Sequence, residues 1–454
     1  MSYIDPSIKY IGYTGCYTEP KQADPFGGMG GVPHDVSKIG TGIQVIGVSK
    51  DGKLCYIGGN ETGGRVNIQK STGEKLDEVD YDSLGLSNPS YLEISESDSN
   101  GKRYLCTASE VDKGAKMYSF VVDPTKNSTR LIHLSTIPVD TSYPCHFGMI
   151  SDPLGSDHKD QVLTVMCSYG RDEDNAGVST FLIKSKDAGD SECVSKIQEI
   201  VYNGNGSKSK LDRQLSSHAH STATCPGVPD EIFMADLGKD AIIQYQLEPA
   251  IASGGKSVVN LKESGKLGVP LGSGPRSLTF RPSASDAVFS ERGVIGVVSL
   301  EIKASLLLVR RRSHDGCLEI LQPPVSVLPE AWPKDESIAK FNKGRWASDV
   351  VWSPCGKFVF AAARLHNSIS IFELKNRKND DGESEFCLEL KERVSTGGQT
   401  PRCLCMSPEG DFLLIAHQHS HDITCFQIDN ENGKLTLTDK LEHPLAACLK
   451  LIPA

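Results

Sequence analysis

Polar residues recur at two places along this chain, at the start of one short apolar strand and at the end of the next. The first set consists of Ser90, His146, His220, Arg276, Asp349 and Arg402. The second set consists of Glu110, Tyr169, Asp236, Glu291, Arg364 and Gln418. Guanidinium groups bind carboxylate or phosphate through paired hydrogen bonds, and a histidine or glutamate can activate water or carry a proton. The two sets together predict an anion-binding site with acid–base groups.

Other chemistries have less support in the sequence. Any single polar group of the two sets could instead serve the fold, by hydrogen bonding to backbone carbonyls of neighbouring strands. No Ser-x-x-Lys, Gly-x-Ser-x-Gly or P-loop pattern occurs in a catalytic context, so a serine nucleophile and nucleotide hydrolysis are not supported. We therefore expect general acid–base chemistry without a cofactor.

Two groups of residues could bind a metal ion, and neither pattern is complete. His417, His419 and His421 alternate, so in an extended strand they could face one way as ligands. A turn is expected at residues 420–422, however, which breaks the alternation and favours a polar loop. Cys403 and Cys405 share a strand face, but no second pair has the spacing of a zinc site. We expect no metal.

The elements that must position the polar sets are repeated strands. Each copy has a polar residue opening a strand, a turn such as Pro-x-Gly, a second strand that ends in a polar residue, and a third strand of alternating apolar positions. Six full copies begin near Asn88, Pro144, Ser217, Gly274, Ala347 and Thr400. In the copy that begins at Gly274, the second strand is predicted at Ala287–Glu291. Repetition of this kind decides the fold class.

The two chain ends complete a seventh unit. The segment Tyr10–Leu54 supplies only later strands, and the run Ala446–Ile452 supplies the missing first strand. Units of roughly 45 to 60 residues with four short strands are typical of a β-propeller, and closure by the termini removes an exposed sheet edge. The sequence predicts an all-β, seven-bladed β-propeller whose first blade is closed by the N- and C-terminal strands.

Because the blades repeat around one axis, a single domain can accommodate the whole chain of 454 residues. We expect a single domain over residues 1–454, with polar loop insertions near 20–38, 252–264 and 376–385. In a blade, the first strand begins at the same face to which the second strand returns. The two polar sets should therefore form a ring around one mouth of the central channel.

Composition limits the partners and the compartment. The chain has 58 acidic and 48 basic residues, a formal charge of −10, and one dense basic cluster at Arg310–Arg312. Nucleic acid is an unsuitable partner because phosphate neutralisation needs a basic face. No apolar run approaches the roughly 20 residues of a membrane helix, and residues 1–14 lack the apolar core of a secretory signal. We expect a cytoplasmic protein with reduced, buried cysteines; its oligomeric state stays open.

Several of these motifs resemble the lactonase seven-bladed propeller family. The resemblance runs from about Tyr13 to Ile452. Its motifs are Asn88-Pro89-Ser90-Tyr91-Leu92, Pro144-Cys145-His146, His218-Ala219-His220 with Asp236-Leu237-Gly238, Gly274-Pro275-Arg276, Ser353-Pro354 with Arg364, and Pro401-Arg402 with Gln418. The family includes propeller-type 6-phosphogluconolactonases, which hydrolyse a sugar lactone, and fungal carboxy-cis,cis-muconate cyclases, which form a lactone from an unsaturated polycarboxylate.

The resemblance implies four catalytic positions, which here are His220 or its neighbour His218, Arg276, Glu291 and Arg364; we take His220 as the histidine. We expect substrate contacts from a second group, which comprises His146, His218, Asp236, Arg402, Gln418 and Glu110. The sequence departs from the family pattern at Ala219, where proline is usual, at Ser277 and at Ser290. These departures leave the choice of substrate open.

The expected function is hydrolysis of a small anionic sugar lactone resembling 6-phosphogluconolactone, with no metal. Glu291 or His220 would activate water, and Arg276 would stabilise the oxyanion of the tetrahedral intermediate. Arg364 and Arg402 would hold the phosphate or carboxylate of the substrate. Two alternatives stay open: a muconate-type cyclase that uses the same arginines, and a propeller that binds a partner without catalysis.

Overall fold

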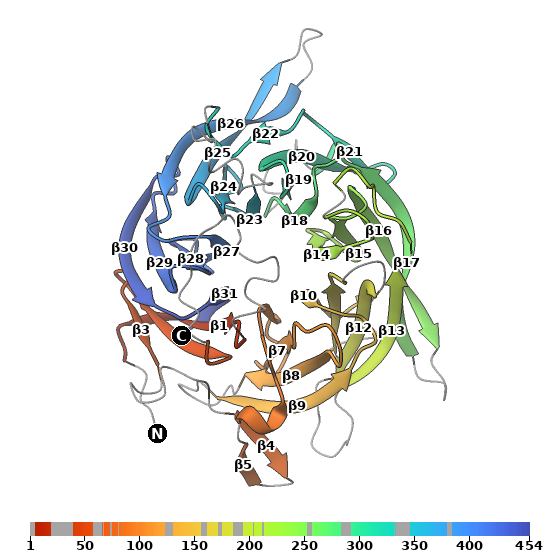
Figure 1. The fold of residues 1–454 in the computed structure, drawn as a ribbon, viewed down its shortest axis with the longest axis vertical. Coiled ribbons are helices and arrows are strands. Elements are labelled where there is room, and N and C mark those ends of the chain that lie inside the picture. Colours follow the sequence, from red (N-terminus) through yellow and green to blue (C-terminus); the bar gives the residue numbers. More distant parts are fainter. Residues whose placement is uncertain are drawn as a thin grey trace.

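Seven sheets, antiparallel except for the parallel pairing of one outer strand (Ile68–Thr72) in the second, surround a central axis in the computed structural model of this chain (Figure 1). The structure describes residues 5–19, 40–57, 66, 68–72, 75–79, 81–122, 130–155, 161–170, 175–184, 194–202, 204–210, 213–251, 257–282, 292–330, 332, 346–378 and 384–454. The predicted fold class is confirmed. Within the described residues, no helix is long and apolar enough to cross a membrane.

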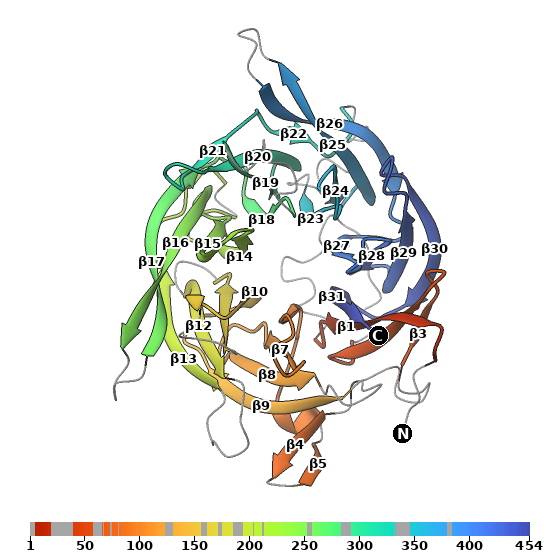
Figure 2. The same ribbon diagram turned by 180° about the vertical axis from the view of Figure 1, so that it is seen from behind.

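The first blade is built from both ends of the chain, as the sequence predicted. From the axis outward it contains β31 (Ala446–Pro453), β1 (Ile8–Cys16), β2 (Gln44–Ser49) and β3 (Leu54–Tyr56). Tyr13 of β1 pairs with Lys450 of β31 in antiparallel register. Seen from behind, the two strands still lie side by side (Figure 2). The C-terminal strand therefore closes the ring.

The second and third blades carry the next part of the chain. The second contains β6 (Leu92–Ile94), β7 (Arg103–Ala108), β8 (Lys116–Val122) and β9 (Leu131–Pro138), and the hairpin β4 (Ile68–Thr72) and β5 (Lys75–Val79) extends its outer edge. A short 3-10 helix, η3 (Tyr81–Leu84), precedes β6. The third contains β10 (Pro144–Ser151), β11 (Gln161–Ser168), β12 (Ala176–Lys184) and β13 (Val194–Tyr202).

The remaining four blades follow in chain order. The fourth contains β14 (Ala219–Cys225), β15 (Val228–Asp236), β16 (Ala241–Ile251) and β17 (Ser257–Gly268). The fifth contains β18 (Pro275–Phe280), β19 (Gly293–Leu300), β20 (Ser305–Arg312), β21 (Leu318–Ile320) and β22 (Val325–Ser326). The sixth contains β23 (Ala347–Trp352), β24 (Phe358–Ala363), β25 (Ser368–Lys378) and β26 (Ser384–Ser395). The seventh contains β27 (Pro401–Met406), β28 (Phe412–His417), β29 (Asp422–Ile428) and β30 (Leu435–Glu442).

The hydrophobic core lies between neighbouring blades rather than on the axis. One cluster joins the fifth and sixth blades through Val297, Leu308, Val350 and Ala361, all buried. This packing covers the middle strands on both faces. Strands such as β24 are therefore continuous apolar runs in which every residue is buried. Because the apolar residues are used between the sheets, the positions that face the axis are free to be polar.

Three sequence predictions differ from the structure. The second strand of the fifth blade is β19 (Gly293–Leu300), which pairs with β18, and not the predicted Ala287–Glu291. The predicted insertion at 252–264 overlaps β17, which begins at Ser257 and pairs along its length with β16. Similarly, β25 extends to Lys378 and β26 begins at Ser384, within the predicted 376–385 loop. Both loops were predicted too long because these segments are rich in polar residues and glycine, although backbone pairing continues into them. The 20–38 insertion lies outside the described residues.

Candidate active site

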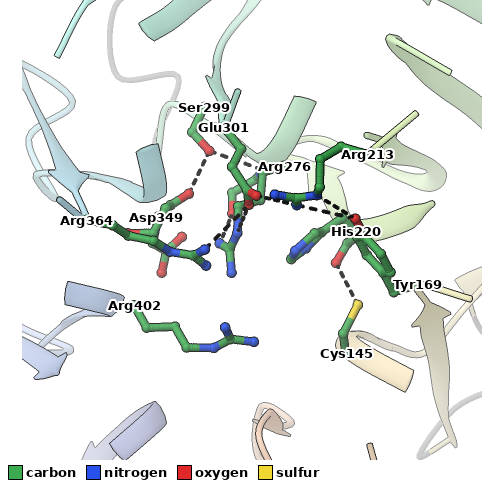
Figure 3. Close-up of polar contacts among 12 residues, drawn as sticks. Cys145, Tyr169, Arg213, His220, Arg276, Ser299, Glu301, Asp349, Arg364 and Arg402 are labelled. Carbon is green, nitrogen blue, oxygen red and sulfur yellow. Dashed lines mark hydrogen bonds and ion pairs between the residues drawn. The ribbon is translucent and has the colours of Figure 1, made fainter. Parts of the chain in front are cut away.

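A cluster of charged side chains lies at one end of the axis, where the innermost strands begin (Figure 3). His220, Arg276 and Arg402 each occupy the second position of an innermost strand, β14, β18 and β27 respectively. Glu301 and Arg364 directly follow the second strands β19 and β24. The strand order of a propeller blade brings these two kinds of position to the same mouth, as the repeat predicted.

Glu301 is the centre of the cluster. Its side chain is about 2% exposed, and its carboxylate lies 2.5 Å from Nη2 of Arg213, 2.9 Å from Nε of Arg276 and 3.9 Å from Nη1 of Arg364. Burial alone would raise the pKa of Glu301, but Arg213, Arg364 and Arg276 outweigh it and hold the pKa well below its usual range. Glu301 is therefore a fixed negative charge that orients three guanidinium groups, and a poor proton acceptor.

The cluster contains more positive than negative charge. Its four guanidinium groups, those of Arg213, Arg276, Arg364 and Arg402, outnumber its three carboxyl groups, which belong to Glu301, Asp349 and Glu110. Burial lowers the pKa of Arg364 to about 9. Glu301 acts to raise this pKa, whereas the neighbouring Arg276 and Arg402 lower it further. Repulsion among cations in a buried site is relieved by an added negative charge. The electrostatics of this site therefore favour an anionic ligand.

His220 is the titratable group beside these arginines. Its side chain is buried, and its ring meets the Tyr169 ring edge-on at 5.8 Å between centroids. Burial, followed by the nearby Arg276, holds the pKa of His220 well below 6.5, so the imidazole is neutral at physiological pH. Among the described residues, no hydrogen-bond partner reaches its buried Nδ1. A neutral imidazole next to guanidinium groups can accept a proton from water.

Tyr169 and His218 form the support behind His220. The two rings stack with centroids 4.1 Å apart, and Nδ1 of His218 donates to the carbonyl of Tyr169 at 2.7 Å. Arg213 donates to the Tyr169 hydroxyl at 3.3 Å and lies over the ring of Trp346. The described contacts of His218 therefore hold Tyr169 and the wall of the site in place, and they do not involve the side that faces the axis.

No contact in the described part of the chain connects Asp236 with the arginine cluster. Its carboxylate accepts the backbone N–H groups of His218 and Lys239, both at 2.9 Å, and the hydroxyl of Ser217. These bonds hold the turn that joins β15 to β16 and the segment that leads into β14. The geometry gives Asp236 a role in the backbone of the fourth blade, and its contact with substrate stays a prediction.

A second carboxylate, Glu110, lies near Arg402 and Arg276 of the cluster. It accepts the hydroxyl of Tyr17 at 3.0 Å and that of Ser90. The guanidinium of Arg402 lies 5.2 Å from the centroid of the Tyr17 ring and donates to the side-chain oxygen of Gln418 at 3.5 Å. Burial raises the pKa of Glu110, and Arg402 is the strongest opposing influence. Glu110, Arg402 and Gln418 thus belong to one connected group.

His146 faces a cavity of about 470 Å³ in the central channel. Its ring contacts the Tyr91 ring at 4.3 Å between centroids, tilted by 31°, and its Nδ1 accepts the backbone N–H of Thr222 at 3.3 Å. Lys450 and Glu93 form an ion pair of 2.7 Å on the same wall. The cavity also includes Ser277, the neighbour of Arg276. His146 is therefore positioned to meet hydroxyl groups of a ligand that extends along the axis.

The structure brings four of the predicted residues together, His220, Arg276, Arg364 and Arg402. Glu291 lies outside the described residues, and the glutamate that closes the second strand of this blade is Glu301. Sequence reasoning missed Glu301 because the second strand was placed too early. The signal was present, since the apolar run at 294–300 ends in this glutamate. Arg213 was missed because it lies in the connection before β14, where no strand pattern marks it.

The three alternating histidines lie around the turn after β28. His417 lies at the strand end, with its Nδ1 2.9 Å from Asp422. His419 contacts the Thr400 hydroxyl at 2.9 Å, and His421, with a φ of 57°, accepts the backbone N–H of Leu445. The three rings thus have different surroundings. Within the described ranges, no group of three or more His, Cys, Asp or Glu residues could hold a metal ion.

A seven-bladed propeller with a charged cluster at one mouth of its axis defines the class of this protein. The family model described as "Lactonase, 7-bladed beta-propeller" matches residues 54–451, and the chain belongs to this family. The resemblance read from the sequence motifs is thereby confirmed.

Individual relatives are more distant. The chain is 25% identical to a 6-phosphogluconolactonase of Bacillus subtilis over 368 residues, which cover 81% of this chain and 88% of the relative. It is 26% identical to a 6-phosphogluconolactonase of Formosa agariphila over 372 residues, with the same two coverages. Among solved structures, a periplasmic gluconolactonase of Pseudomonas aeruginosa has a TM-score of 0.67 at 22% identity, covering 98% of this chain and 99% of that one. The last similarity shows the fold alone.

Proposed function

We propose that this protein hydrolyses an anionic sugar lactone of the 6-phosphogluconolactone type. The observation that carries the proposal is the surplus of buried guanidinium groups around Glu301, next to the neutral imidazole of His220. Membership of the lactonase family and relatives named 6-phosphogluconolactonase support lactone hydrolysis.

The proposed mechanism needs no covalent intermediate. His220 takes a proton from water as the water oxygen attacks the lactone carbonyl, and Arg276 stabilises the oxyanion of the tetrahedral intermediate. Arg364 and Arg402 hold the anionic substituent of the substrate, because paired N–H donors match phosphate or carboxylate. Glu301 does not act as the base; it fixes the guanidinium groups that do the binding.

A substrate panel tests the assignment. The purified protein is expected to open 6-phosphogluconolactone faster than the same lactone without phosphate, with both rates corrected for spontaneous opening. Cyclisation of muconate-type acids is the competing reaction, since the same arginines could clamp several carboxylates. Turnover of muconate-type acids with no acceleration of lactone opening would replace hydrolase by cyclase.

His220→Gln provides the matching residue test. Loss of the general base is expected to lower kcat by about 10²- to 10⁴-fold, whereas the exposed His314→Gln keeps the parent rate. Because the pKa of His220 lies well below 6.5, the parent enzyme should keep its kcat/KM as pH falls through 6.5 and lose it only at more acidic pH. A rate that halves near pH 6.5 would assign the base to another group.

A further inference from the structure

Glu110 is a second carboxylate of the site whose surroundings differ from those of Glu301. It follows β7 in the second blade, and its side chain is only partly buried. It accepts two hydroxyl hydrogen bonds, from Tyr17 at the end of the first blade and from Ser90 ahead of β6. Among the described residues, no cation lies within ion-pair distance of its carboxylate, whereas Glu301 has three.

The two carboxylates are therefore suited to different roles. Glu301 is locked in its ionised form by three guanidinium groups. Glu110 is held by hydroxyl groups, which can hydrogen bond to either protonation state because a hydroxyl both donates and accepts. Burial raises the pKa of Glu110 above its ordinary value of 4.5. Two carboxyl groups whose environments move their pKa values apart are a recurring arrangement of acid–base sites.

Lactone opening also needs a proton donor that the proposed mechanism has not yet assigned. When the tetrahedral intermediate collapses, the bond between the acyl carbon and the ring oxygen breaks, and the ring oxygen leaves with the electron pair. An alkoxide is a poor leaving group, so protonation of that oxygen accelerates the step. His220 holds the proton taken from water and can return it, but a second acid in the site can protonate the ring oxygen directly.

We propose that Glu110 is this second acid–base residue: its carboxyl group donates a proton to the ring oxygen as the C–O bond breaks. Atoms balance, since water adds hydroxyl to the acyl carbon, Glu110 supplies hydrogen to the leaving oxygen, and the proton on His220 returns to Glu110 through solvent. The inference rests on the proposed lactonase function and adds a catalytic role to a residue that was expected only to contact substrate.

The charged and titratable groups around Glu110 determine how its pKa responds to substitution. Tyr17 and Ser90 donate to the carboxylate, and Arg402 and Arg276 act on it from the arginine cluster; all four lower its pKa. The buried thiol of Cys145 is the other titratable neighbour. Removal of the Tyr17 hydroxyl withdraws a hydrogen bond from the ionised form and must therefore raise the pKa of Glu110 further.

The test is the pH dependence of kcat for lactone opening by the full chain. With a carboxyl group as donor, the rate falls on the alkaline side as Glu110 ionises. Glu110→Gln is expected to lower kcat by about 10²- to 10⁴-fold, the usual range for loss of an acid catalyst, and to remove the alkaline decline. Tyr17→Phe is expected to keep much of the rate and to move the decline to higher pH. A merely structural role would not produce this shift.

Tyr56→Phe is the matched control, because the Tyr56 hydroxyl donates to the carbonyl of Glu442 at 2.7 Å, in the outer part of the first blade. It should leave the whole profile unchanged. An alkaline decline that persists in Glu110→Gln, or one that stays in place or moves to lower pH in Tyr17→Phe, overturns the role of Glu110 while lactonase activity stands. Absence of lactone opening by the unsubstituted protein overturns the proposed function, and the role of Glu110 with it.

Discussion

At the scale of single residues, the site depends on one carboxylate that keeps three arginines in place. Burying a guanidinium group is costly unless a negative charge compensates it. Glu301 compensates Arg213, Arg276 and Arg364 at once. Its substitution should therefore harm the stability of the fold as well as the chemistry, which distinguishes it from a residue that contacts substrate alone.

Glu301→Gln preserves the size of the side chain and removes the charge. We expect the free energy of unfolding to fall by about 3–5 kcal/mol, the usual cost of breaking a buried ion pair on one side, and lactone opening to fall to the level of the spontaneous reaction. Urea denaturation of the two proteins measures the first effect.

The control for this substitution is Glu319→Gln on β21. Glu319 pairs with Arg310 and Arg312 at the surface, with about 27% of its side chain exposed. Surface ion pairs contribute about 0–1 kcal/mol, so the control should unfold almost like the parent. Equal losses of unfolding free energy in the two variants would show that Glu301 does not compensate the buried charges of the three arginines.

Residue roles were only partly predictable from the sequence. Strand ends could be placed by the repeat, so His220, Arg276, Arg364 and Arg402 could be grouped before any coordinates. Glu301 was missed because the short apolar stretch that begins at Ala287, before β19, was predicted to be the second strand of the blade. Arg213 could not have been found, since its ion pair joins a connection between blades to a strand end 88 residues further along.

At the scale of elements, the ring is closed by a single strand. Every blade except the first is formed by one continuous part of the chain, whereas β1 and β31 meet from opposite ends of the sequence. The C-terminal strand thus joins the largest hydrophobic cluster, which spans the seventh, first and second blades. The stability of this strand should decide whether the ring stays closed.

Leu449→Ala on β31 tests this closure. Leu449 is 1% exposed, and truncation of a buried leucine costs about 2–5 kcal/mol. Leu437 on the outermost strand of the seventh blade is 50% exposed, so Leu437→Ala should change the free energy of unfolding by less than about 0.5 kcal/mol. Similar unfolding midpoints for both variants would mean that β31 contributes little to holding the ring.

The pairing of the two termini was predictable from the repeat, because the first unit lacked an inner strand and the last segment of the chain supplied an unused one. The lengths of hairpins were harder to predict. In the β16–β17 and β25–β26 pairs, the second strand begins within a stretch rich in polar residues, although Val258, Val259 and Phe386 there are buried. Alternation, the main signal of a strand, fades there although the backbone pairing continues.

At the scale of the whole molecule, the apolar clusters lie between blades and the polar groups lie around the axis. This division leaves several histidines in surroundings that water barely reaches. The pKa values of His146, His220 and His443 are lowered mainly by burial. Each is neutral in the folded protein at a pH where an exposed imidazole would be protonated.

These histidines couple folding to pH. Burial lowers the pKa of His443 from 6.5 to about 3, so between these values the unfolded chain binds a proton that the folded chain does not. Stability is complete above pH 6.5 and falls as pH decreases toward 3, by up to about 1.4 kcal/mol per pH unit for each such group. His146 and His220 act in the same direction.

His443 is the most informative of these residues because it lies at the closure of the ring. Its Nε2 contacts the Thr14 hydroxyl of β1 at 2.6 Å, and its backbone N–H donates to the carbonyl of His421 in the seventh blade. His443→Gln removes the titration, so its unfolding free energy should decline less steeply than that of the parent between pH 6.5 and 4, while His314→Gln, on an exposed turn, follows the parent. Urea denaturation at a series of pH values measures both slopes. A parent slope retained in His443→Gln would mean that water reaches this imidazole in the folded ring, and that the closure between β1 and β31 opens more readily than the burial of Thr14 and His443 indicates.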